Sequence, residues 1–447
     1  MATHATTSDP NLASPTAGRQ RLPWVITGLL VVFVIINWAD KAVFGIAAQS
    51  LKEDLGLSSS TIGFIGSAFF FLFTVTGIVV GFIANRISTK WILFVLAIAW
   101  TLTQVPVLLA ASATTLLVSR IALGAAEGPA TSMATAATFE WFKKERQGLP
   151  AALINSGASI AKIAIAPILA VIVVNWGWRA AFLTLALAGL GWAAAWLLIG
   201  RQGPYAQHQS KQATPETSDE QSAAAIGTSD NFTVPFWRIA LTPSYLGAVL
   251  GTFAVYGLVT VVLTWLPSYF EEGLGFSRVA AGSMFGLPSV AALMVMITVT
   301  TITDRRMRAG AGSRAARVWV TAAAMIVGGG LLIALPWIEL PTVAVVAVSV
   351  GYGFAVLVLP MMSTVVSEIC PTNQRAGALG LFIALQGVAG LIAPAVTGAL
   401  VDSAVTPADG YSQSFQIFGA VVLVGAIVVA LLVHPERDSL RLRKFAS

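Results

Sequence analysis

The sequence predicts an all-α membrane protein with twelve transmembrane helices in two pseudo-symmetric halves of six. Apolar residues make up 56% of the 447 residues and charged residues only 10%, whereas an average soluble domain carries roughly 25% charged residues. The apolar runs are continuous over about 20 residues or more, which is the length of a membrane-spanning helix, and they do not alternate like the strands of a membrane barrel. A polar stretch near the middle of the chain divides these runs into two sets.

The first set of apolar runs predicts an N-terminal half over residues 23–200, preceded by a polar cytoplasmic tail over residues 1–22. The first run passes into Asn37, Trp38, Ala39, Asp40 and Lys41 without a small-residue cleavage site, so we interpret it as a retained span and not as a signal peptide. The six spans are predicted at 23–49, 61–85, 90–110, 114–140, 148–174 and 180–200.

The second set predicts a C-terminal half over residues 241–433, followed by a cytoplasmic tail over residues 434–447. Residues 201–240 are rich in Gln, Ser, Thr, Glu and Asp, a composition that favours a flexible cytoplasmic linker between the halves. The six spans of this half are predicted at 243–270, 279–303, 315–335, 341–367, 374–401 and 412–433.

The basic residues predict the orientation of the chain. With both termini inside, 20 of the 26 Lys and Arg residues fall in cytoplasmic segments, and Lys52, Arg179 and Arg278 fall in outer loops. An excess of basic residues on the cytoplasmic side is typical of membrane proteins. We therefore expect a multi-pass protein of a bacterial-type inner (plasma) membrane with cytoplasmic termini, and we attribute the net charge of +6 to this bias and not to nucleic-acid binding.

The same composition excludes several other classes of protein and site. A single cysteine, Cys370, cannot form an internal disulfide, and no spacing of ligands predicts a metal site or a cofactor. The three histidines lie in the tails or the middle stretch, so none can relay protons inside the membrane. No cluster of nucleophile, base and orienting group predicts an enzyme. We expect a monomer.

A short turn recurs in the two halves. Residues 81–86 read Gly-Phe-Ile-Ala-Asn-Arg after the second predicted span, and residues 300–305 read Thr-Thr-Ile-Thr-Asp-Arg after the eighth. Asn85 and Arg86 thus correspond to Asp304 and Arg305. Parallel repeats of this kind are typical of transporters built from two related halves.

Several motifs together carry a resemblance that covers nearly the whole chain. They are Gly81-x-x-x-Asn85-Arg86-x-x-x-Lys90, Ile36-Asn-Trp-Ala-Asp40-Lys41, Ser67-Ala-Phe-Phe-Phe-Leu-Phe73, Arg120-x-x-x-Gly124-x-x-Glu127-x-Pro129, Trp265-Leu-Pro-Ser-Tyr269, Gly177-Trp-Arg179 and Ser367-Glu368-Ile-Cys-Pro371. The first resembles the loop motif of the major facilitator superfamily, and the others resemble its anion:cation symporter branch. The resemblance implies the major facilitator fold and the uptake of a small organic anion with protons by alternating access.

The loop motif departs from the family pattern. Asn85 stands where the family usually has Asp, and Ser88 stands where it has Gly. In the family that Asp pairs with basic residues and helps to latch the outward-open state. We expect a weaker latch here and a shifted population of conformations.

Five charged residues fall inside predicted spans: Asp40, Lys41, Arg120, Glu127 and Lys162. A charge in a span costs about 2.5–3.5 kcal/mol on insertion scales, so such residues usually face a bundle interior or an aqueous cavity. If all five share one cavity, its net charge is +1, and it rises to +3 when both acids are protonated. Protonation would then strengthen anion binding.

Arg120 and Glu127 are seven residues apart, so they share one helix face two turns apart. We expect Arg120 to contact the anion and Glu127 to carry a proton, because a guanidinium matches a carboxylate and burial disfavours a charged acid. The alternative is a structural ion pair between helices.

Asp40 and Lys41 are adjacent and diverge on the helix, so they are not expected to pair with each other. The resemblance implies proton coupling for Asp40 and anion binding for the basic residue after it, which is usually Arg in the family. Lys41 offers a point charge without the guanidinium fork, and the alternative is a lysine that extends to the membrane surface.

Lys162 has no counterpart in the family pattern. It shares a helix face with Ser159 and with Asn155, which is a further candidate substrate contact, and it should lie level with Glu127. We expect it to pair with Glu127 or to contact the substrate, and the alternative is a structural tie between spans.

Other candidate substrate contacts bear on the kind of acid. Phe73 stands where relatives often have Tyr, Ala158 stands where sugar-acid transporters have Gln, Ser363 lies in a segment without the Trp of some relatives, and Gln386 lies beside the position of a usual Asn. A site without hydrogen-bonding groups has little preference for polyhydroxy substrates over less polar ones. These departures favour a small or aromatic carboxylate.

The seventh span adds aromatic candidates. We expect Tyr256 and Trp265 to line the cavity, near a bend at Pro267, and Tyr269 to belong to the outer interfacial belt. Core packing is the alternative for each of these residues and for Phe73.

Several other candidate functions remain besides proton-coupled uptake. An organic-anion exchanger or uniporter would use the same cavity. A drug/proton antiporter is disfavoured, because residues 165–169 lack the glycines of the antiporter motif and because a cationic cavity suits anions. A non-transporting sensor would need a soluble output domain larger than the linker or tail.

Overall fold

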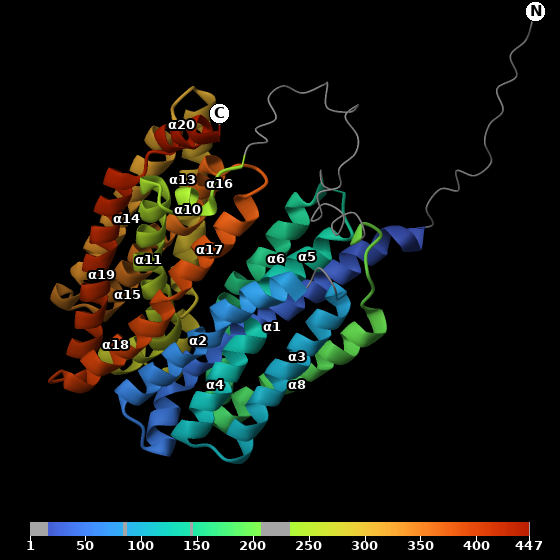
Figure 1. The fold of residues 1–447 in the computed structure, drawn as a ribbon. Helices are drawn as coiled ribbons and strands as arrows, with labels where there is room; N and C mark the ends of the chain where they lie inside the picture. Colours follow the sequence, from blue (N-terminus) through green and yellow to red (C-terminus); the bar gives the residue numbers. More distant parts are fainter. Residues whose placement is uncertain (1–16, 84–86, 144–145, 207–232, 447) are drawn as a thin grey trace, which may run out of the picture.

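Residues 17–83, 87–143, 146–206 and 233–446 are described by the computed structural model, and they are almost entirely helical. No strand occurs in these ranges. Figure 1 shows two helical bundles side by side, one coloured blue to green and the other yellow to red. The predicted all-α fold of two halves is confirmed.

The helices of the N-terminal half follow the predicted spans closely. They are α1 (Ala17–Leu55), α2 (Ser59–Ile83), α3 (Thr89–Leu109), α4 (Ala113–Glu127), α5 (Ala130–Phe139), α6 (Gly148–Ile160), the π-helical turn η2 (Ala161–Ile165), α7 (Ala166–Trp176) and α8 (Trp178–Ile199).

The helices of the C-terminal half show the same agreement. They are α10 (Phe236–Ala240), α11 (Pro243–Ser268), η3 (Tyr269–Gly273), α12 (Arg278–Met284), α13 (Leu287–Arg308), η4 (Arg314–Val318), α14 (Trp319–Ile333), η5 (Leu335–Trp337), α15 (Pro341–Val356), α16 (Val358–Ile369), α17 (Arg375–Gly387), α18 (Ala389–Ser403), α19 (Pro407–Leu432) and α20 (Pro435–Ala446).

Eleven helical stretches of the described chain are long and apolar enough to cross a membrane. The twelfth crossing is made by α4 and α5 together, and it is interrupted at Gly128 and Pro129. Proline has no backbone N–H to donate within a helix, so the span is divided into pieces of 15 and 10 residues. This break directly follows Glu127.

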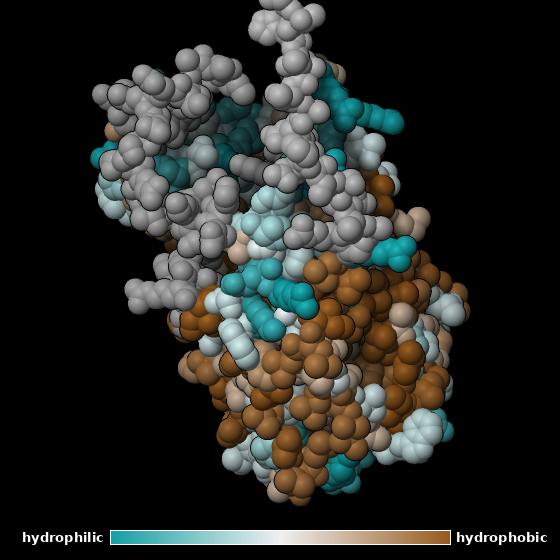
Figure 2. Space-filling model, turned by 90° about the vertical axis from the view of Figure 1, so that its right-hand side faces the viewer, coloured by the Kyte–Doolittle hydropathy of each residue, from teal (hydrophilic) through white to brown (hydrophobic). Residues whose placement is uncertain are grey.

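The outer surface of the bundles is apolar over a broad area. Figure 2 shows the hydrophobic surface below an end that is more hydrophilic. A belt of this kind matches the hydrocarbon core of a bilayer. The chain is a multi-pass membrane protein.

The two halves meet along α1 and α2 of one half and α11 and α18 of the other, with a further contact between α7 and α12. Glycines allow this close approach. A Cβ atom at Gly45 would meet the carbonyl oxygens of Leu263 and Thr264, and one at Gly63 would meet the carbonyl oxygen of Pro394. Backbone therefore packs against backbone where α1 crosses α11 and α2 crosses α18.

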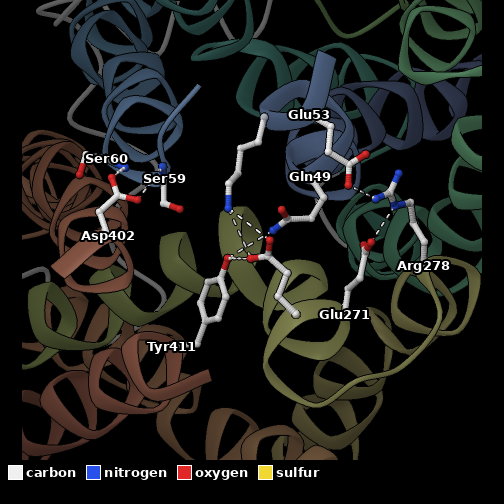
Figure 3. A network of polar contacts seen from close by, with 10 residues as sticks. Gln49, Glu53, Ser59, Ser60, Glu271, Arg278, Asp402 and Tyr411 are labelled. Carbon is white, nitrogen blue, oxygen red and sulfur yellow. Dashed lines mark hydrogen bonds and ion pairs between the residues drawn. The ribbon is translucent and has the colours of Figure 1, made fainter. Parts of the chain in front are cut away.

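Polar contacts join the halves at the end of the molecule opposite the C-terminus, which we call the closed end. Figure 3 shows these contacts among residues of α1 and α2 and residues of the second half. Arg278 Nη2 donates to Glu53 Oε1 at 2.9 Å, and Lys52 Nζ lies 3.3 Å from Glu272 Oε1. Tyr411 donates its hydroxyl to Glu272 and accepts a hydrogen bond from Gln49.

Asp402 of α18 caps the first turn of α2. Its carboxylate accepts the backbone N–H of Ser59 at 2.9 Å and that of Ser60 at 2.7 Å (Figure 3). An anion at a helix N-terminus satisfies free N–H donors and interacts favourably with the helix dipole. This side chain is therefore one of the contacts that join the halves at the closed end.

Asp402→Ala should shift the population towards conformations that are open at this end, because two charge-assisted hydrogen bonds between the halves are lost. Spin labels at Leu109 and Val405, whose side chains are 82% and 98% exposed, measure the separation of the halves. We expect a larger fraction of long distances in the variant.

The matched control for this measurement is Asp409→Ala. Asp409 accepts from Thr406 Oγ1 at 2.7 Å in the first turn of α19, so it supports the N-terminus of a helix without joining the halves. An unchanged distance distribution in Asp402→Ala would show that the cap does not hold the closed end.

The C-terminal helix α20 is fixed to the start of α11. Asp438 accepts hydrogen bonds from Ser244 N at 2.9 Å and Ser244 Oγ at 2.7 Å, and Arg437 Nε lies 2.9 Å from its other oxygen. Burial raises the pKa of Asp438, but the hydrogen bonds from Arg437 and Ser244 outweigh it and hold the pKa below its usual range. The carboxylate therefore stays charged and keeps α20 against the bundle.

Candidate functional site

A buried cluster of charged side chains lies between α1 and α4. Helix α1 contributes Asp40 and Lys41, and α4 contributes Arg120 and Glu127. Each of these residues is at most 7% exposed. Four of the five predicted in-span charges therefore lie together.

Close helix packing in the N-terminal half positions this cluster. A Cβ atom at Gly124 would collide with the carbonyl oxygen of Phe69, and one at Gly128 would collide with that of Phe73. These glycines bring α4 against the aromatic stretch of α2. Glu127 lies between them on the same helix.

The central contact is an ion pair between Lys41 and Glu127, with Lys41 Nζ 2.7 Å from Glu127 Oε2. Lys41 Nζ also donates to Asn37 Oδ1 at 2.6 Å. The second carboxylate oxygen of Glu127 has no hydrogen-bond partner in the described chain. Lys41 is therefore held inside the bundle, which contradicts the alternative of a lysine that extends to the membrane surface.

Asp40 and Arg120 are less completely paired. Asp40 Oδ1 accepts from Gln104 Nε2 at 3.0 Å, and its other oxygen has no partner among the described residues. Arg120 Nη1 donates to the backbone oxygen of Asp40 at 3.4 Å, and its guanidinium lies 4.2 Å from the centroid of the Phe44 ring. Within the described ranges Arg120 makes no salt bridge, and its Nη2 has no hydrogen-bond partner. A buried cation without a carboxylate partner is suited to binding an anion.

Aromatic rings form one side of the cluster. Lys41 Nζ lies 5.8 Å from the centroid of the Phe69 ring and 5.6 Å from that of Phe73. Phe70 faces Tyr256 of α11 across the halves, with ring centroids 6.2 Å apart. Phe73 and Tyr256 are thus both near the cluster.

A small cavity of about 20 Å³ opens beside Arg120 and Lys41. That volume holds roughly one water molecule. Its other lining residues come from α1, α2 and α11, and include Phe44, Phe70 and Thr264. Both halves of the protein therefore border the cations.

Lys162 lies apart from this cluster, in the turn η2. It lines a separate cavity of about 190 Å³ together with Ser159. It forms no ion pair with Glu127, whose partner is Lys41. The expectation that all five charges share one cavity is wrong, and so is the expectation that Lys162 pairs with Glu127. Lys41 of α1, and not Lys162, is the ion-pair partner of Glu127 of α4.

Two aromatic residues of the seventh span are packed in the core. Trp265 is fully buried and donates its indole N–H to the backbone oxygen of Pro394 at 2.9 Å. Tyr269 is 1% exposed and packs on Phe415, with ring centroids 5.0 Å apart. The structure thus does not place Trp265 in the cavity or Tyr269 in the interfacial belt. Both join α11 and η3 to neighbouring helices of the same half.

The remaining substrate candidates are spread along the bundle. Asn155 is exposed and donates to Ala151 O of its own helix at 2.9 Å. Ser363 borders an open pocket of about 440 Å³ with Glu368 and Arg375. Gln386 has a buried Oε1 without a hydrogen-bond partner in the described chain. None of the three contacts the charged cluster.

Part of the predicted loop motif is outside the described residues. Asn85 and Arg86 fall there, whereas Gly81 lies in the last turn of α2. Lys90 lies in the first turn of α3 and donates to Leu197 O at 3.4 Å. Asp304 and Arg305 are exposed residues in the last turns of α13, not in a loop as expected.

Sequence reasoning missed several polar groups near the charges. Gln104 binds Asp40, Asn37 binds Lys41, and Ser289 and Tyr352 face Lys162 across its cavity. A polar side chain inside an otherwise apolar span was the available signal for Gln104. In the described ranges no group of three or more His, Cys, Asp or Glu residues could hold a metal ion.

Two helical halves, one end closed by contacts between them, and buried cations beside a cavity that both halves border are features of a membrane transporter built from two repeats. The sequence profile described as Major Facilitator Superfamily matches residues 29–358 and 317–446. This chain belongs to the Major Facilitator Superfamily.

Its curated relatives are named as transporters of organic anions. The "Probable sulfoacetate transporter SauU" of Cupriavidus necator is 27% identical over 92% of this chain and 94% of that protein. The "Hexuronate transporter" of Bacillus subtilis is 25% identical over 93% of this chain and 96% of its own length. The "D-galactonate transporter" of Escherichia coli is 22% identical over 95% and 97%. The chain is a transporter and not an enzyme.

Solved structures show the same fold. The crystal structure of the "D-xylose-proton symporter" superimposes with a TM-score of 0.73 at 17% identity, covering 93% of this chain and 99% of the other. A bacterial homologue of Spinster, in an inward-facing and unoccupied conformation, gives a TM-score of 0.72 at 16% identity over 94% and 98%.

Proposed function

We propose that the protein imports a small or aromatic carboxylate together with protons by alternating access. The observation that supports this most is the composition of the buried cluster. It contains two acids and two bases, yet only Lys41 and Glu127 form an ion pair. Proton uptake by the acids would therefore leave two buried cations for an anion.

Glu127 is the proton carrier most directly linked to the anion site in this proposal. Protonation of its carboxylate removes the charge that holds Lys41, and the released ammonium can then bind a substrate carboxylate. Asp40 has a free carboxylate oxygen that can accept the other proton. Protonation of both acids changes the net charge of the cluster from zero to +2.

Arg120 is the proposed second anion contact. Its free Nη2 and the small cavity beside it leave room for one oxygen of a substrate. A guanidinium presents two parallel N–H donors to a carboxylate, which a lysine cannot do. The adjacent rings of Phe69, Phe70 and Tyr256 favour an acid with an apolar body.

The orientation of the chain in the membrane supports an inward-facing conformation. With both termini in the cytoplasm, as the basic residues suggest, the closed end faces the outside of a bacterial-type inner membrane. Residues 201–240 would then be the cytoplasmic linker that allows the halves to rock. The relatives are named as transporters of sulfoacetate, hexuronate and D-galactonate, which supports an acidic substrate.

The test is uptake of a panel of carboxylates into proteoliposomes with an inward proton gradient. We expect accumulation of at least one acid, and we expect a proton ionophore to abolish it. Accumulation that survives the ionophore when a second acid is loaded inside would identify an exchanger. Uptake of no acid, together with export of lipophilic cations, would contradict the proposal and identify a drug/proton antiporter.

A further inference from the structure

Lys162 is an intramembrane cation that the proposed coupling does not use. No hydrogen bond or ion pair connects its ammonium to any described residue, and Nζ lies 5.2 Å from the centroid of the Trp38 ring. A cation in a membrane span is costly, and unpaired ones usually face a cavity that receives a ligand. The resting structure therefore leaves this charge without a counter-ion.

The cavity at Lys162 lies between the two halves. Ser159 and Lys162 line it from the N-terminal half, and Ser289 and Tyr352 line it from the C-terminal half. Its volume of about 190 Å³ is enough for several heavy atoms. Apolar side chains such as Met296 and Leu357 form much of the remaining wall.

Hydroxyl groups in this cavity are available as hydrogen-bond donors. No hydrogen bond between described residues uses the side-chain oxygens of Ser159, Ser289 or Tyr352. Each of these hydroxyls can donate to an oxygen of an acid. One ammonium and three hydroxyls around the cavity can all donate to the oxygens of an acid, and no carboxylate of the described residues lines the cavity.

The backbone at Lys162 is held in place by the second half. Lys162 lies in a π-helical turn, a feature that often marks functional positions in membrane and soluble helices. A Cβ atom at Gly286 would come within 2.9 Å of Lys162 O and 2.8 Å of Ile163 Cα. The start of α13 therefore packs directly on this turn and fixes the lysine beside the cavity.

The ring of Trp38 lies near the ammonium groups of both Lys162 and Lys41. Lys41 Nζ also lies 5.2 Å from the centroid of the Trp38 ring, so the two ammonium groups are at most twice that distance apart. A charge-assisted contact has an N···O distance of about 2.8 Å. A short carbon chain with an acidic group at each end can therefore reach both cations.

We propose that the Lys162 cavity binds a second acidic group, so that the preferred substrate is a dianion with two carboxylates or with one carboxylate and one sulfonate. This inference rests on the proposed function and names its substrate class. One acidic group binds at Arg120 and the released Lys41, and the other binds at Lys162 and the hydroxyls. A monoanion of the same length fills the same space but leaves Lys162 without a partner.

Isothermal titration of the purified protein with glutarate and with valerate tests this assignment. The two acids have five carbons and differ in the second carboxylate. We expect wild type to bind glutarate about tenfold or more tightly than valerate, since one additional charge-assisted contact contributes at least that factor. Lys162→Met should lower the affinity for glutarate to that for valerate and leave valerate unchanged.

Two further variants and one control accompany the titration. Lys162→Arg keeps the charge and should retain the preference for glutarate. The double variant Ser289→Ala, Tyr352→Phe should weaken the binding of glutarate but not that of valerate. It tests the second subsite even if Lys162→Met does not fold. Lys143→Met is the control, because Lys143 is exposed and outside the spans.

Each outcome is informative. If wild type binds neither glutarate nor valerate and also takes up no acid of the proteoliposome panel, the proposed function itself fails; if it takes up another acid of that panel but binds neither of these two, only the second subsite is refuted. If it binds both acids equally and Lys162→Met changes neither, the second subsite is refuted while the proposed function stands. Equal weakening of both acids in Lys162→Met would also refute the subsite, because it would assign a general structural role to the lysine.

Discussion

Arg120→Met should abolish uptake and weaken binding of any carboxylate substrate. Loss of one partner from a buried, hydrogen-bonded charge pair costs about 2–5 kcal/mol, so we expect a Kd at least roughly thirtyfold higher. The folded protein should not lose an ion pair, because Arg120 forms none with the described residues. Methionine also keeps a flexible apolar side chain over Phe44.

The measurement combines titration of a bound acid with thermal unfolding of the ligand-free variant. Weak binding with an unchanged Tm would assign the anion contact to Arg120. Arg120→Lys keeps the charge but loses the planar fork, and it should bind with intermediate affinity. Arg179→Met, which removes an exposed ion pair with Asp54, is the control and should bind as wild type does. Wild-type affinity in Arg120→Met would remove Arg120 from the site.

Glu127→Gln should uncouple transport from protons. Glutamine cannot be charged, so Lys41 is released at every pH and the anion site is permanently formed. We expect substrate exchange across the membrane to continue, while a pH gradient no longer drives accumulation. Wild type gains about 1.4 kcal/mol per proton from a gradient of one pH unit, and the variant should lose that contribution.

Proteoliposomes distinguish the two modes of transport. Counterflow of labelled substrate reports exchange, and uptake under an imposed pH gradient reports coupling. Glu368→Gln is the control, because Glu368 pairs with Arg317 away from the cluster. Gradient-driven accumulation that persists in Glu127→Gln would assign the coupling proton to another group, with Asp40 as the next residue to test.

The span positions could be predicted from the sequence, because the cost of apolar and polar groups in lipid depends on composition alone. The predicted fourth span, 114–140, matches the combined extent of α4 and α5 despite the break after Glu127. Charged residues inside spans were visible for the same reason. Their identity as Asp40, Lys41, Arg120, Glu127 and Lys162 followed directly from the sequence.

The partners of those charges could not be predicted. Helix periodicity places Arg120 and Glu127 on one face, but it does not say which neighbouring helix that face meets. Lys41 thus took the role expected for Lys162 as the partner of Glu127. The predicted positions of Trp265 and Tyr269 were wrong for a related reason. An aromatic residue near a helix bend packs equally well on protein or beside a cavity.

Contacts between the two halves could not be predicted from the sequence either. Asp402 and the N-terminus of α2 are separated by 343 positions in the chain. No local pattern connects a carboxylate near the end of one span with backbone N–H groups at the start of another. Such contacts depend on how the two halves are arranged in space.

The glycines at the crossing of the halves leave no room for a side chain in this conformation. A Cβ atom at Gly45 or Gly63 would meet backbone of the opposite half, which is close here because the closed end is shut. A bulky side chain there would be excluded from this arrangement and accommodated once the halves part. Gly45→Val should therefore trap the outward-open conformer, and the label distance between Leu109 and Val405 should report one long population.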